Sequence, residues 1–429
     1  MIDYFSAAKV RALFPFWLSL LLLSACAGGP FQAMQLPTRA ATAAPLALIP
    51  EIAGTDVPVT WTPLPTSEIE VDNQPVMRGP TAVSSATPLI PTSTSSPTPV
   101  PPTPTPSNTP APTPYTSFIP NLPPSGDLGP SKLGIHVNRN NDPAIMEFVR
   151  RAQPAVMKGV GDLGFLEEVK QVSPRTITIG RVPNDVQHYG GNPEEEARQW
   201  VADHLFQYRS NPYVDYWEGW NEPDPNVDNM AWYARFEAER AREMARHGFR
   251  VAIGGFPAGV PELHEFELFL PAIEAAIEHR GIMTLHEGSA PTIDYLFGAP
   301  LPGYPAYPDR GAMSFRYRWY YREILEPAGL AIPLVISELG IDGQIGMNRP
   351  GPQGLGWRDF QGYWAQEGHW GSTGTEAFVN QLAWYDNGVR QDGYVIGFAI
   401  FTAGGTSRWE SYDINSILPR LADYVIGQR

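Results

Sequence analysis

From residue 131 to the end of the chain, short apolar runs alternate with longer segments in which apolar residues recur at helical spacing. This alternation is typical of parallel strands that are joined by crossover helices. Eight such units fit into residues 131–429, and eight units predict a (β/α)8 TIM barrel. The expected strands lie at residues 133–138, 155–160, 176–181, 214–222, 250–256, 282–286, 332–338 and 394–401.

Helix starts mark the same units. Asp142 stands before Pro143, and Asn192 stands before Pro193 and three glutamates; both arrangements favour the first turn of a helix. The alternative fold is an open, doubly wound sheet, but no Gly-rich phosphate loop follows the first strand. The other helices are expected at residues 163–172, 230–247, 262–279, 313–325, 375–388 and 414–426.

The amino-terminal end has the pattern of an export signal. Lys9 and Arg11 precede an apolar segment at residues 12–23, which is shorter than a comfortable membrane span. The sequence LSAC follows and ends at Cys26; it resembles a bacterial lipobox, in which the cysteine is lipidated. We therefore expect residues 1–25 to be a lipoprotein signal peptide. An ordinary secretory signal and an uncleaved anchor are the alternatives, and all three place the remaining chain outside the cytoplasm, at the cell surface in the lipid-anchored case.

Residues 26–130 lack the pattern of a folded domain. Residues 87–114 contain 11 Pro and 12 Ser or Thr among 28 positions and no charged residue, so they cannot build a core. Proline-rich chain favours an extended conformation of about 3.1 Å per residue, which suits a stalk. We expect a disordered Pro/Ser/Thr-rich linker. Residues 30–86 contain short strand-like pieces, and a small strand-rich module is the alternative there.

Charge and cysteine content narrow the function classes. The net charge is −15, and most of it lies in the predicted barrel. An acidic barrel disfavours nucleic acid as a partner, because phosphate binding needs basic patches. Neutral substrates fit better. Cys26 is the only cysteine, so the sequence excludes an intramolecular disulfide and a cysteine-based metal site.

Two of the predicted strands end in a glutamate. The fourth runs into WEGWNEPD at residues 217–224, and the seventh contains LVISELG at residues 334–340. These stretches resemble the clan A glycoside hydrolases, in which the acid/base lies in Asn-Glu-Pro after the fourth barrel strand and the nucleophile ends the seventh. The resemblance implies that Glu222 is the acid/base and Glu338 the nucleophile. Both would lie at the carboxyl ends of the strands, where the catalytic groups of this fold converge.

The resemblance also implies a reaction. A retaining glycosidase cleaves an O-glycosidic bond by double displacement with two carboxyl groups about 5–5.5 Å apart. We expect a β-linked neutral glycan as substrate, no metal or organic cofactor, and a monomer. Asn221 would hydrogen-bond the sugar hydroxyl next to the anomeric carbon. The alternatives are a glycan-binding barrel without turnover and a structural surface protein in which both glutamates are buried salt-bridge partners.

The sixth strand ends in His286, where the family often has His-x-Tyr. His286 is a candidate site residue, but the tyrosine is missing here, and Tyr295 is a candidate replacement. Glu287 is a rival carboxylate. By strand alternation, only one of His286 and Glu287 can face the barrel interior.

Further polar residues on the strands are candidates for the site. Glu218 would lie lower in the fourth strand than Glu222, and a buried acid there would need a cation. Arg181 and Lys158 are the candidates for that cation, and the family often has an arginine where Lys158 stands. His136 and Asn138 end the first strand and are candidates for lining the pocket, with a core role equally open for His136.

Aromatic side chains would supply the stacking surfaces that sugar rings need. The Gly-rich stretch after the seventh strand contains four such rings, Trp357, Tyr363, Trp364 and Trp370. We expect at least half of them to pack this insertion onto the barrel, and Trp364 and Trp370 are candidate substrate contacts. The eighth strand ends in Phe401 where the family often has a tryptophan. Phe401, or Trp409 nearby, would then form the floor of the sugar site.

Overall fold

The computed structural model describes residues 128–184, 186–345 and 349–429. The predicted signal peptide, Cys26 and nearly all of the predicted linker lie outside these residues and stay predictions. Within the described residues, no helix is both long and apolar enough to cross a membrane.

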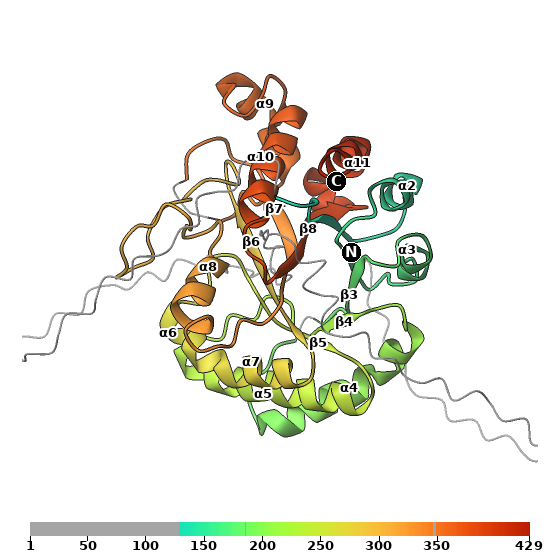
Figure 1. The fold of residues 1–429 in the computed structure, drawn as a ribbon, viewed down its shortest axis with the longest axis vertical. Helices are drawn as coiled ribbons and strands as arrows, with labels where there is room; N and C mark the ends of the chain where they lie inside the picture. Colours follow the sequence, from blue (N-terminus) through green and yellow to red (C-terminus); the bar gives the residue numbers. More distant parts are fainter. Residues whose placement is uncertain (1–127, 185, 346–348) are drawn as a thin grey trace, which may run out of the picture. The chain divides into compact units, whose positions relative to one another are not determined.

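Eight parallel strands close into a barrel in which each strand pairs with its neighbours in the chain and β8 pairs with β1 (Figure 1). The predicted (β/α)8 TIM barrel is confirmed, and the open doubly wound sheet is excluded because an open sheet has edge strands. The strands are β1 (Leu133–Val137), β2 (Val156–Val160), β3 (Ile177–Arg181), β4 (Tyr216–Glu218), β5 (Val251–Phe256), β6 (Ile282–Ser289), β7 (Leu334–Ile341) and β8 (Val395–Ala403).

Helices surround the barrel and cover its outer face (Figure 1). Two predicted helix starts are confirmed, because the side chain of Asp142 accepts a hydrogen bond from Ala144 N–H and that of Asn192 accepts one from Glu195 N–H. The helices are α2 (Pro143–Ala152), α3 (Leu166–Val172), α4 (Pro193–Ser210), α5 (Val227–Arg246), α6 (Leu263–Phe266), η1 (Glu267–Phe269), α7 (Leu270–Glu278), α8 (Tyr317–Tyr320), η2 (Tyr321–Leu325), α9 (Trp357–Glu367), α10 (Gly374–Val389), η3 (Ser407–Tyr412), η4 (Asn415–Ile417) and α11 (Leu418–Gly427).

The fourth strand is shorter than predicted. It ends at Glu218, and Glu222 lies four residues beyond it with a φ of 50°, a left-handed conformation that a strand cannot contain. The segment remains attached to β5, because Glu222 N–H donates a hydrogen bond of 3.1 Å to Gly255 O. The backbone therefore holds Glu222 in place without a strand around it.

The insertion after β7 contains a helix that the sequence analysis treated as Gly-rich loop. Trp357, Phe360 and Trp364 are buried on one face of α9, at a helical spacing of three and four residues. Trp357 and Trp364 stack on Phe378 of α10, with ring centroids 4.9 and 5.9 Å apart. The insertion is therefore a helix packed on its neighbour.

The unit after β6 also differs from the prediction. The helix expected at residues 313–325 begins only at Tyr317, and a single α-helical turn is followed by the π-helical segment η2. The preceding residues are held instead by the segment that follows β6 and by the side chain of Glu287 in β6. Ser314 Oγ donates a hydrogen bond to Ile293 O, and the N–H of Phe315 donates one of 2.7 Å to Glu287.

Side chains fill the barrel interior in two layers. Alternation along a strand places the residue two positions further on the same face. The lower layer is apolar. Two residues beyond its members on β2, β3 and β4 stand Lys158, Arg181 and Glu218. A charged layer therefore lies at the carboxyl ends of the strands. The apolar layer joins side chains from seven strands: Val156, Ile179, Tyr216, Ala252, Ile282, Val335, Ile396 and Ala399.

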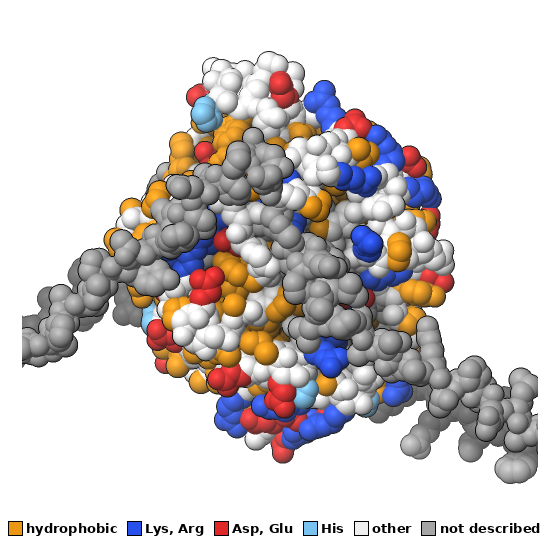
Figure 2. Space-filling view, viewed as in Figure 1, with side chains coloured by type: hydrophobic (Ala, Val, Ile, Leu, Met, Phe, Trp, Pro, Cys, Tyr) orange, Lys and Arg blue, Asp and Glu red, His pale blue; other side chains and the backbone are white. Residues whose placement is uncertain are grey.

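The outer helices carry interleaved charges, which Figure 2 shows at the lower edge of the molecule over α4 and α5. Arg235 Nε lies 2.8 Å from Glu194 Oε1, and Arg198 Nη1 lies 2.9 Å from Glu239 Oε1. Pairs of this kind near solvent contribute about 0–1 kcal/mol each. The apolar barrel layer and the packing of helices on strands must therefore supply most of the stability.

Candidate active site

Glu338 lies in β7, fully buried at the level of the charged layer. Its Oε1 accepts hydrogen bonds from Lys158 Nζ at 2.7 Å and Arg181 Nη1 at 3.2 Å. Its Oε2 has no hydrogen-bond partner among the described residues. Burial raises the pKa of Glu338, while the charges of Lys158 and Arg181 act to lower it. One oxygen is thus bound by two cations, and the other keeps its lone pairs free.

Glu222 lies on the segment that follows β4, with its side chain 9% exposed. Burial raises its pKa well above the usual range, and the negative charge of Glu338 raises it further. The charge of Asp342 acts in the same direction. The surroundings therefore favour the protonated form of Glu222 more strongly than that of Glu338, whose pKa two cations act to lower.

His286 joins the two carboxyl groups. Its Nδ1 lies 3.0 Å from Glu222 Oε1, and its Nε2 lies 3.7 Å from Glu338 Oε1. Burial lowers the pKa of His286 well below the usual value, and Lys158 and Arg181 lower it further. The ring is therefore neutral, and a single imidazole lies between the two carboxyl groups.

Asn221 is held beside Glu222 by its neighbours. Its Oδ1 accepts a hydrogen bond from Arg181, which leaves the amide Nδ2 facing Glu222 Oε2 at 3.5 Å. Gln187 Nε2 donates a hydrogen bond to the main-chain oxygen of Asn221. Arg181 thus contacts both Asn221 and Glu338. With Glu222 and His286, the structure brings together five of the residues that the sequence predicts for the site.

His136 approaches the same carboxylate from β1. Its Nδ1 shares a hydrogen bond of 2.7 Å with Thr402 Oγ1, and its Nε2 lies 3.8 Å from Glu338 Oε1. Burial lowers its pKa well below the usual value, so it is neutral. The Nε2 atoms of His136 and His286 have no hydrogen-bond partner among the described residues. Together with Glu338 Oε2, they leave three buried polar atoms around one point.

Aromatic rings end β8 next to His136. Phe401 is buried, and its ring centroid lies 4.8 Å from that of His136. Trp409 is partly exposed and packs edge-on against Phe401, with ring centroids 5.1 Å apart. The ring of Tyr412 also packs edge-on against Phe401, at 5.9 Å. An aromatic floor of Phe401 and Trp409 thus borders the histidine of β1.

Two predicted contacts, Trp364 and Trp370, pack within the insertion after β7, while Asn138 stays at the end of β1 without a described side-chain contact to the two glutamates. Trp364 is buried within the insertion, where its Nε1 donates a hydrogen bond of 2.8 Å to Pro291 O; this placement favours packing and not stacking on a sugar. Trp370 is partly buried against Trp384, with ring centroids 6.1 Å apart. Asn138 is partly exposed at the end of β1, and its N–H donates to Ala403 O. The helical spacing of Trp357, Phe360 and Trp364 in the sequence could have indicated that Trp364 packs in a helix.

Glu287 faces away from the barrel interior. Its carboxylate accepts hydrogen bonds from the N–H groups of Phe315 and Tyr317, both at 2.7 Å, and from Tyr385 OH at 2.9 Å. Burial raises its pKa to about 8. The alternation expected at His286 and Glu287 is therefore resolved with His286 inside.

Asp342 was missed by the sequence analysis, and Lys158 was named there only as a candidate cation for Glu218. Asp342 directly follows β7 and is buried, and burial raises its pKa to about 7. The only hint in the sequence was its position, two residues beyond Gly340, the last residue of the LVISELG stretch. Lys158 occupies the position beside Glu338 for which Tyr295 was a candidate. The described contacts of Tyr295 are those of its main chain, with Thr292 and Ser289.

The chemistry of these residues does not suit a metal ion. Among the described residues, no group of three or more His, Cys, Asp or Glu side chains is arranged to hold one. His136, His286 and Glu338 converge, but Lys158 and Arg181 already contact the carboxylate. A cation added there would face two fixed positive charges.

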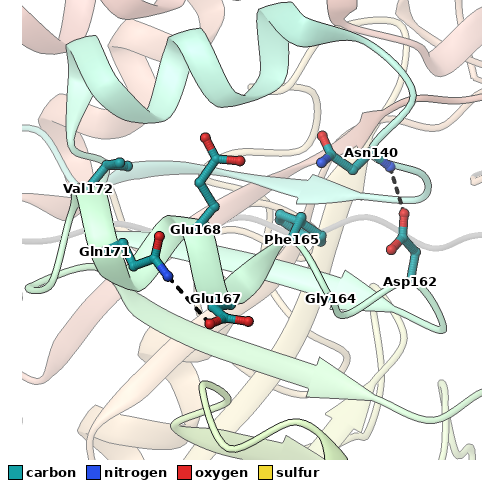
Figure 3. A pocket seen from close by; sticks show the side chains of 8 residues that line it. All are labelled: Asn140, Asp162, Gly164, Phe165, Glu167, Glu168, Gln171 and Val172. Carbon is teal, nitrogen blue, oxygen red and sulfur yellow. Dashed lines mark hydrogen bonds between the residues drawn. The ribbon is translucent and has the colours of Figure 1, made fainter.

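A surface hollow of about 430 Å³ lies where the η3 loop meets the start of α9, and a larger one of about 530 Å³ lies beside α3 (Figure 3). The larger hollow contains three carboxylates, but they already have partners. Asp162 accepts a hydrogen bond from Asn140 N–H and Glu167 one from Gln171 (Figure 3), while Glu168 pairs with Arg150. Neither hollow contains the buried, unpartnered polar atoms that surround Glu338.

No protein-family model matches this chain, and no curated protein matches it by sequence. Among solved structures, XacCel5A in complex with cellopentaose is similar at 10% identity and a TM-score of 0.37, covering 68% of this chain and 99% of that one. The endo-1,4-beta-D-mannanase of Thermotoga petrophila RKU-1 is similar at 13% identity and a TM-score of 0.35, covering 68% and 99%. A sugar phosphate isomerase/epimerase from Parabacteroides distasonis ATCC 8503 is similar at 10% identity and a TM-score of 0.33, covering 68% and 94%. A shared fold does not determine a function, so the site itself must indicate it.

Proposed function

We propose that the barrel is a retaining glycoside hydrolase with Glu338 as nucleophile and Glu222 as acid/base. One observation carries the proposal: the neutral ring of His286 contacts both carboxyl groups, 3.0 Å from one and 3.7 Å from the other. Double displacement needs one carboxyl group protonated and its partner ionised. The environments of Glu222 and Glu338 differ in that sense, because two cations contact only Glu338 at 2.7 and 3.2 Å.

In the first step, Glu338 Oε2 attacks the anomeric carbon of the sugar. The bond from that carbon to the leaving oxygen breaks, and its electron pair stays on the oxygen. Glu222 gives its proton to this oxygen, so the products are a free alcohol, a glycosyl ester of Glu338 and an ionised Glu222. The lost charge of Glu338 removes the repulsion that held the proton on Glu222.

In the second step, Glu222 accepts a proton from a water molecule, whose oxygen attacks the anomeric carbon on the side that the leaving group vacated. The ester bond breaks, and its electron pair returns to Glu338. Two inversions at the same carbon retain its configuration. Both residues end the cycle in their starting protonation states.

The neighbouring residues would bind the sugar that reacts. Nδ2 of Asn221 and the free Nε2 atoms of His136 and His286 are the polar groups next to the two glutamates. Each can hydrogen-bond a sugar hydroxyl. Phe401, with Trp409 beside it, offers an aromatic surface for the apolar face of the ring.

The proposed substrate is a neutral, β-linked glycan. Lys158 and Arg181 are committed to carboxylates, so they are not available as counter-ions for an acidic sugar. An uncompensated sugar carboxylate in a buried site would be costly. Lys158 also makes a poor candidate for a Schiff-base amine, because its Nζ lies between the carboxylates of Glu218 and Glu338. The β-linkage depends on the resemblance of the two strand-end motifs.

Activated aryl glycosides and their 2-deoxy-2-fluoro forms test the proposal. A panel of α- and β-linked neutral sugars identifies the sugar, and the fluorinated form of the same sugar then traps the ester. We expect one added glycosyl group, located on Glu338 by peptide mass spectrometry. The Glu287→Gln variant is the matched control, because it removes a buried carboxyl on the outer side of β6 and should still be labelled. Sugar affinity without turnover or adduct would instead favour a glycan-binding barrel.

The proposed enzyme is exported and attached to a membrane through Cys26, with the Pro-rich segment as a stalk. This part depends on the sequence pattern alone. Radioactive palmitate should label the full chain expressed in a bacterium, and the Cys26→Ser variant should lose both the label and the membrane fraction. Equal labelling of the variant would contradict lipidation at this residue.

A further inference from the structure

Lys158 lies between two buried carboxylates. Its Nζ is 2.8 Å from Glu218 Oε2 and 2.7 Å from Glu338 Oε1, and all three side chains are at most 2% exposed. Arg181 is the second cation of this cluster, 3.2 Å from Glu338 and 3.8 Å from Glu218. The mechanism above uses Glu338 and assigns no task to Glu218.

The positions of these groups follow from the barrel strands. Lys158, Arg181 and Glu218 stand on β2, β3 and β4, each two residues beyond a member of the apolar layer. Glu338 reaches Lys158 across the barrel interior from β7, which is separated from β2 by β1 and β8. The pairing of β7 with β8 shifts its register between Ile336 and Leu339, so Ser337, whose Oγ is 3.3 Å from Lys158, and Glu338 both face inward.

Glu218 is a fixed negative charge. Burial opposes its ionisation, but Lys158 and Arg181 together hold its pKa below the usual value. Glu218 lies lower in the barrel than Glu222, because it stands two residues beyond the apolar layer and four residues before Glu222. It therefore balances one of the two cations without occupying the place of a substrate.

We propose that Glu218 is a positioning residue, which shares Lys158 with Glu338 and leaves one net positive charge for the two catalytic carboxyl groups to use in turn. The inference rests on the proposed function for its meaning in the reaction. In the resting site, Lys158 and Arg181 balance Glu218 and Glu338, while Glu222 is protonated. In the glycosyl ester Glu338 is neutral and Glu222 is ionised, so the cluster is again balanced.

Four charged groups act on the pKa of Glu222 directly. Glu338 and Asp342 on and after β7 raise its pKa, while Lys158 on β2 and Arg181 on β3 lower it. His286 on β6 is neutral. Without Glu218, the two cations would exceed the carboxylates by one charge, and Glu222 would ionise at lower pH. The acid of the first step would then be lost in the free enzyme.

The test is the pKa of Glu222 in the full chain, with glutamate labelled at the side-chain carboxyl carbon with ¹³C and followed by NMR. The Glu222→Gln spectrum assigns the signal. We expect Glu218→Gln to lower the pKa of Glu222 by about one unit or more, because the removed carboxylate shares Lys158 and Arg181 with Glu338 and a nearby charge shifts a buried carboxyl by that amount. Glu218→Asp keeps the charge and should restore most of the wild-type value.

Glu237→Gln is the matched control. Glu237 is equally buried and paired with Arg240, but it stands on α5 outside the barrel wall. The control should lower stability and leave the pKa of Glu222 unchanged. An unchanged pKa in Glu218→Gln, or an equal shift in Glu237→Gln, would overturn the inference.

A double variant covers the case in which Glu218→Gln does not fold. Lys158→Met combined with Glu218→Gln removes one charge of each sign, and replacing a buried ion pair by uncharged groups is often tolerated. The cluster stays balanced, so the pKa of Glu222 should lie near the wild-type value. A value shifted downward by about one unit would contradict charge balance.

The NMR titration of Glu222 tests the role of Glu218 independently of the proposed glycosidase activity. Turnover by the wild-type chain decides the proposed function, and the NMR titration needs no substrate. Where turnover is found, the alkaline limb of kcat/KM should move to lower pH in Glu218→Gln by the same amount as the pKa of Glu222. A merely structural role for Glu218 would lower kcat without moving the limb.

Discussion

His286 and Glu287 are neighbours in β6, but their side chains lie on opposite sides of the barrel wall. His286 contacts Glu222 and Glu338 inside the barrel. Glu287 accepts hydrogen bonds outside it, from main-chain N–H groups at the start of α8 and from Tyr385 of α10. One strand end thus holds the candidate active site on one side and fastens two outer helices on the other.

The first prediction concerns the stability that Glu287 provides. Burial raises its pKa to about 8, above the usual value of an unfolded glutamate. Its protonated form is therefore favoured in the folded state, so its contribution is complete below about pH 4 and is lost as pH rises through about 8. Glu287→Gln should remove this slope. Urea unfolding at pH 5, 7 and 9 should give a wild-type advantage that falls with rising pH, and parallel curves for the two proteins would contradict the prediction.

A second prediction concerns the nucleophile. Glu338→Ala removes the attacking oxygen, and loss of a nucleophile lowers kcat by a factor on the order of 10⁴ or more. Azide is small enough to take its place and should restore turnover of an aryl glycoside with a good leaving group. The product should be a glycosyl azide of inverted configuration. Rescue of Glu222→Ala, in contrast, should give an azide of retained configuration, so exchange of the two outcomes would reverse the assignment.

A third prediction concerns Asp342, which is buried after β7 and has a pKa of about 7. When ionised, it raises the pKa of Glu222. Asp342→Asn removes this charge, so Glu222 should lose its proton at lower pH, and the alkaline limb of kcat/KM should move down. The wild type and the variant should differ little below pH 6, because Asp342 of the wild type is then mostly protonated and, like the asparagine of the variant, carries no charge. Asp386→Asn, a buried acid on α10 that binds Tyr424, is the control and should not move the limb.

The barrel could be predicted from the sequence because its signal is local. Each apolar run is followed by a helix, and caps such as Asp142 mark the boundaries, so counting the units places Glu222 after the fourth and Glu338 in the seventh. The α9 helix was missed because glycines at its edges, such as Gly356 and Gly368, outweighed the helical spacing of its buried rings. Local composition was a weaker guide there than the period of apolar residues.

The charged layer could be predicted only in part. The sequence indicates that Glu218 needs a cation and names Lys158 and Arg181. It does not give the contact from Lys158 to Glu338, because these residues are 180 positions apart and the register shift in β7 decides which side chain faces inward. Strict alternation would place only one of Ser337 and Glu338 inside. The candidate site thus depends on an irregularity that a repeating pattern cannot predict.

The last prediction separates the two kinds of aromatic residue near the site. Trp364 is buried against Phe378, and truncating such a ring costs about 3–5 kcal/mol of stability. Trp409 is partly exposed and adjoins Phe401, which contacts the ring of His136. Trp409→Ala should therefore weaken substrate binding by about 1 kcal/mol, roughly fivefold in KM, with a small change in the unfolding midpoint. Trp364→Ala should lower the unfolding midpoint and leave the KM of the folded enzyme unchanged. If Trp364→Ala raised KM while Trp409→Ala did not, the sugar would lie over the α9 insertion and not over the end of β8, and the aromatic floor would have to be reassigned.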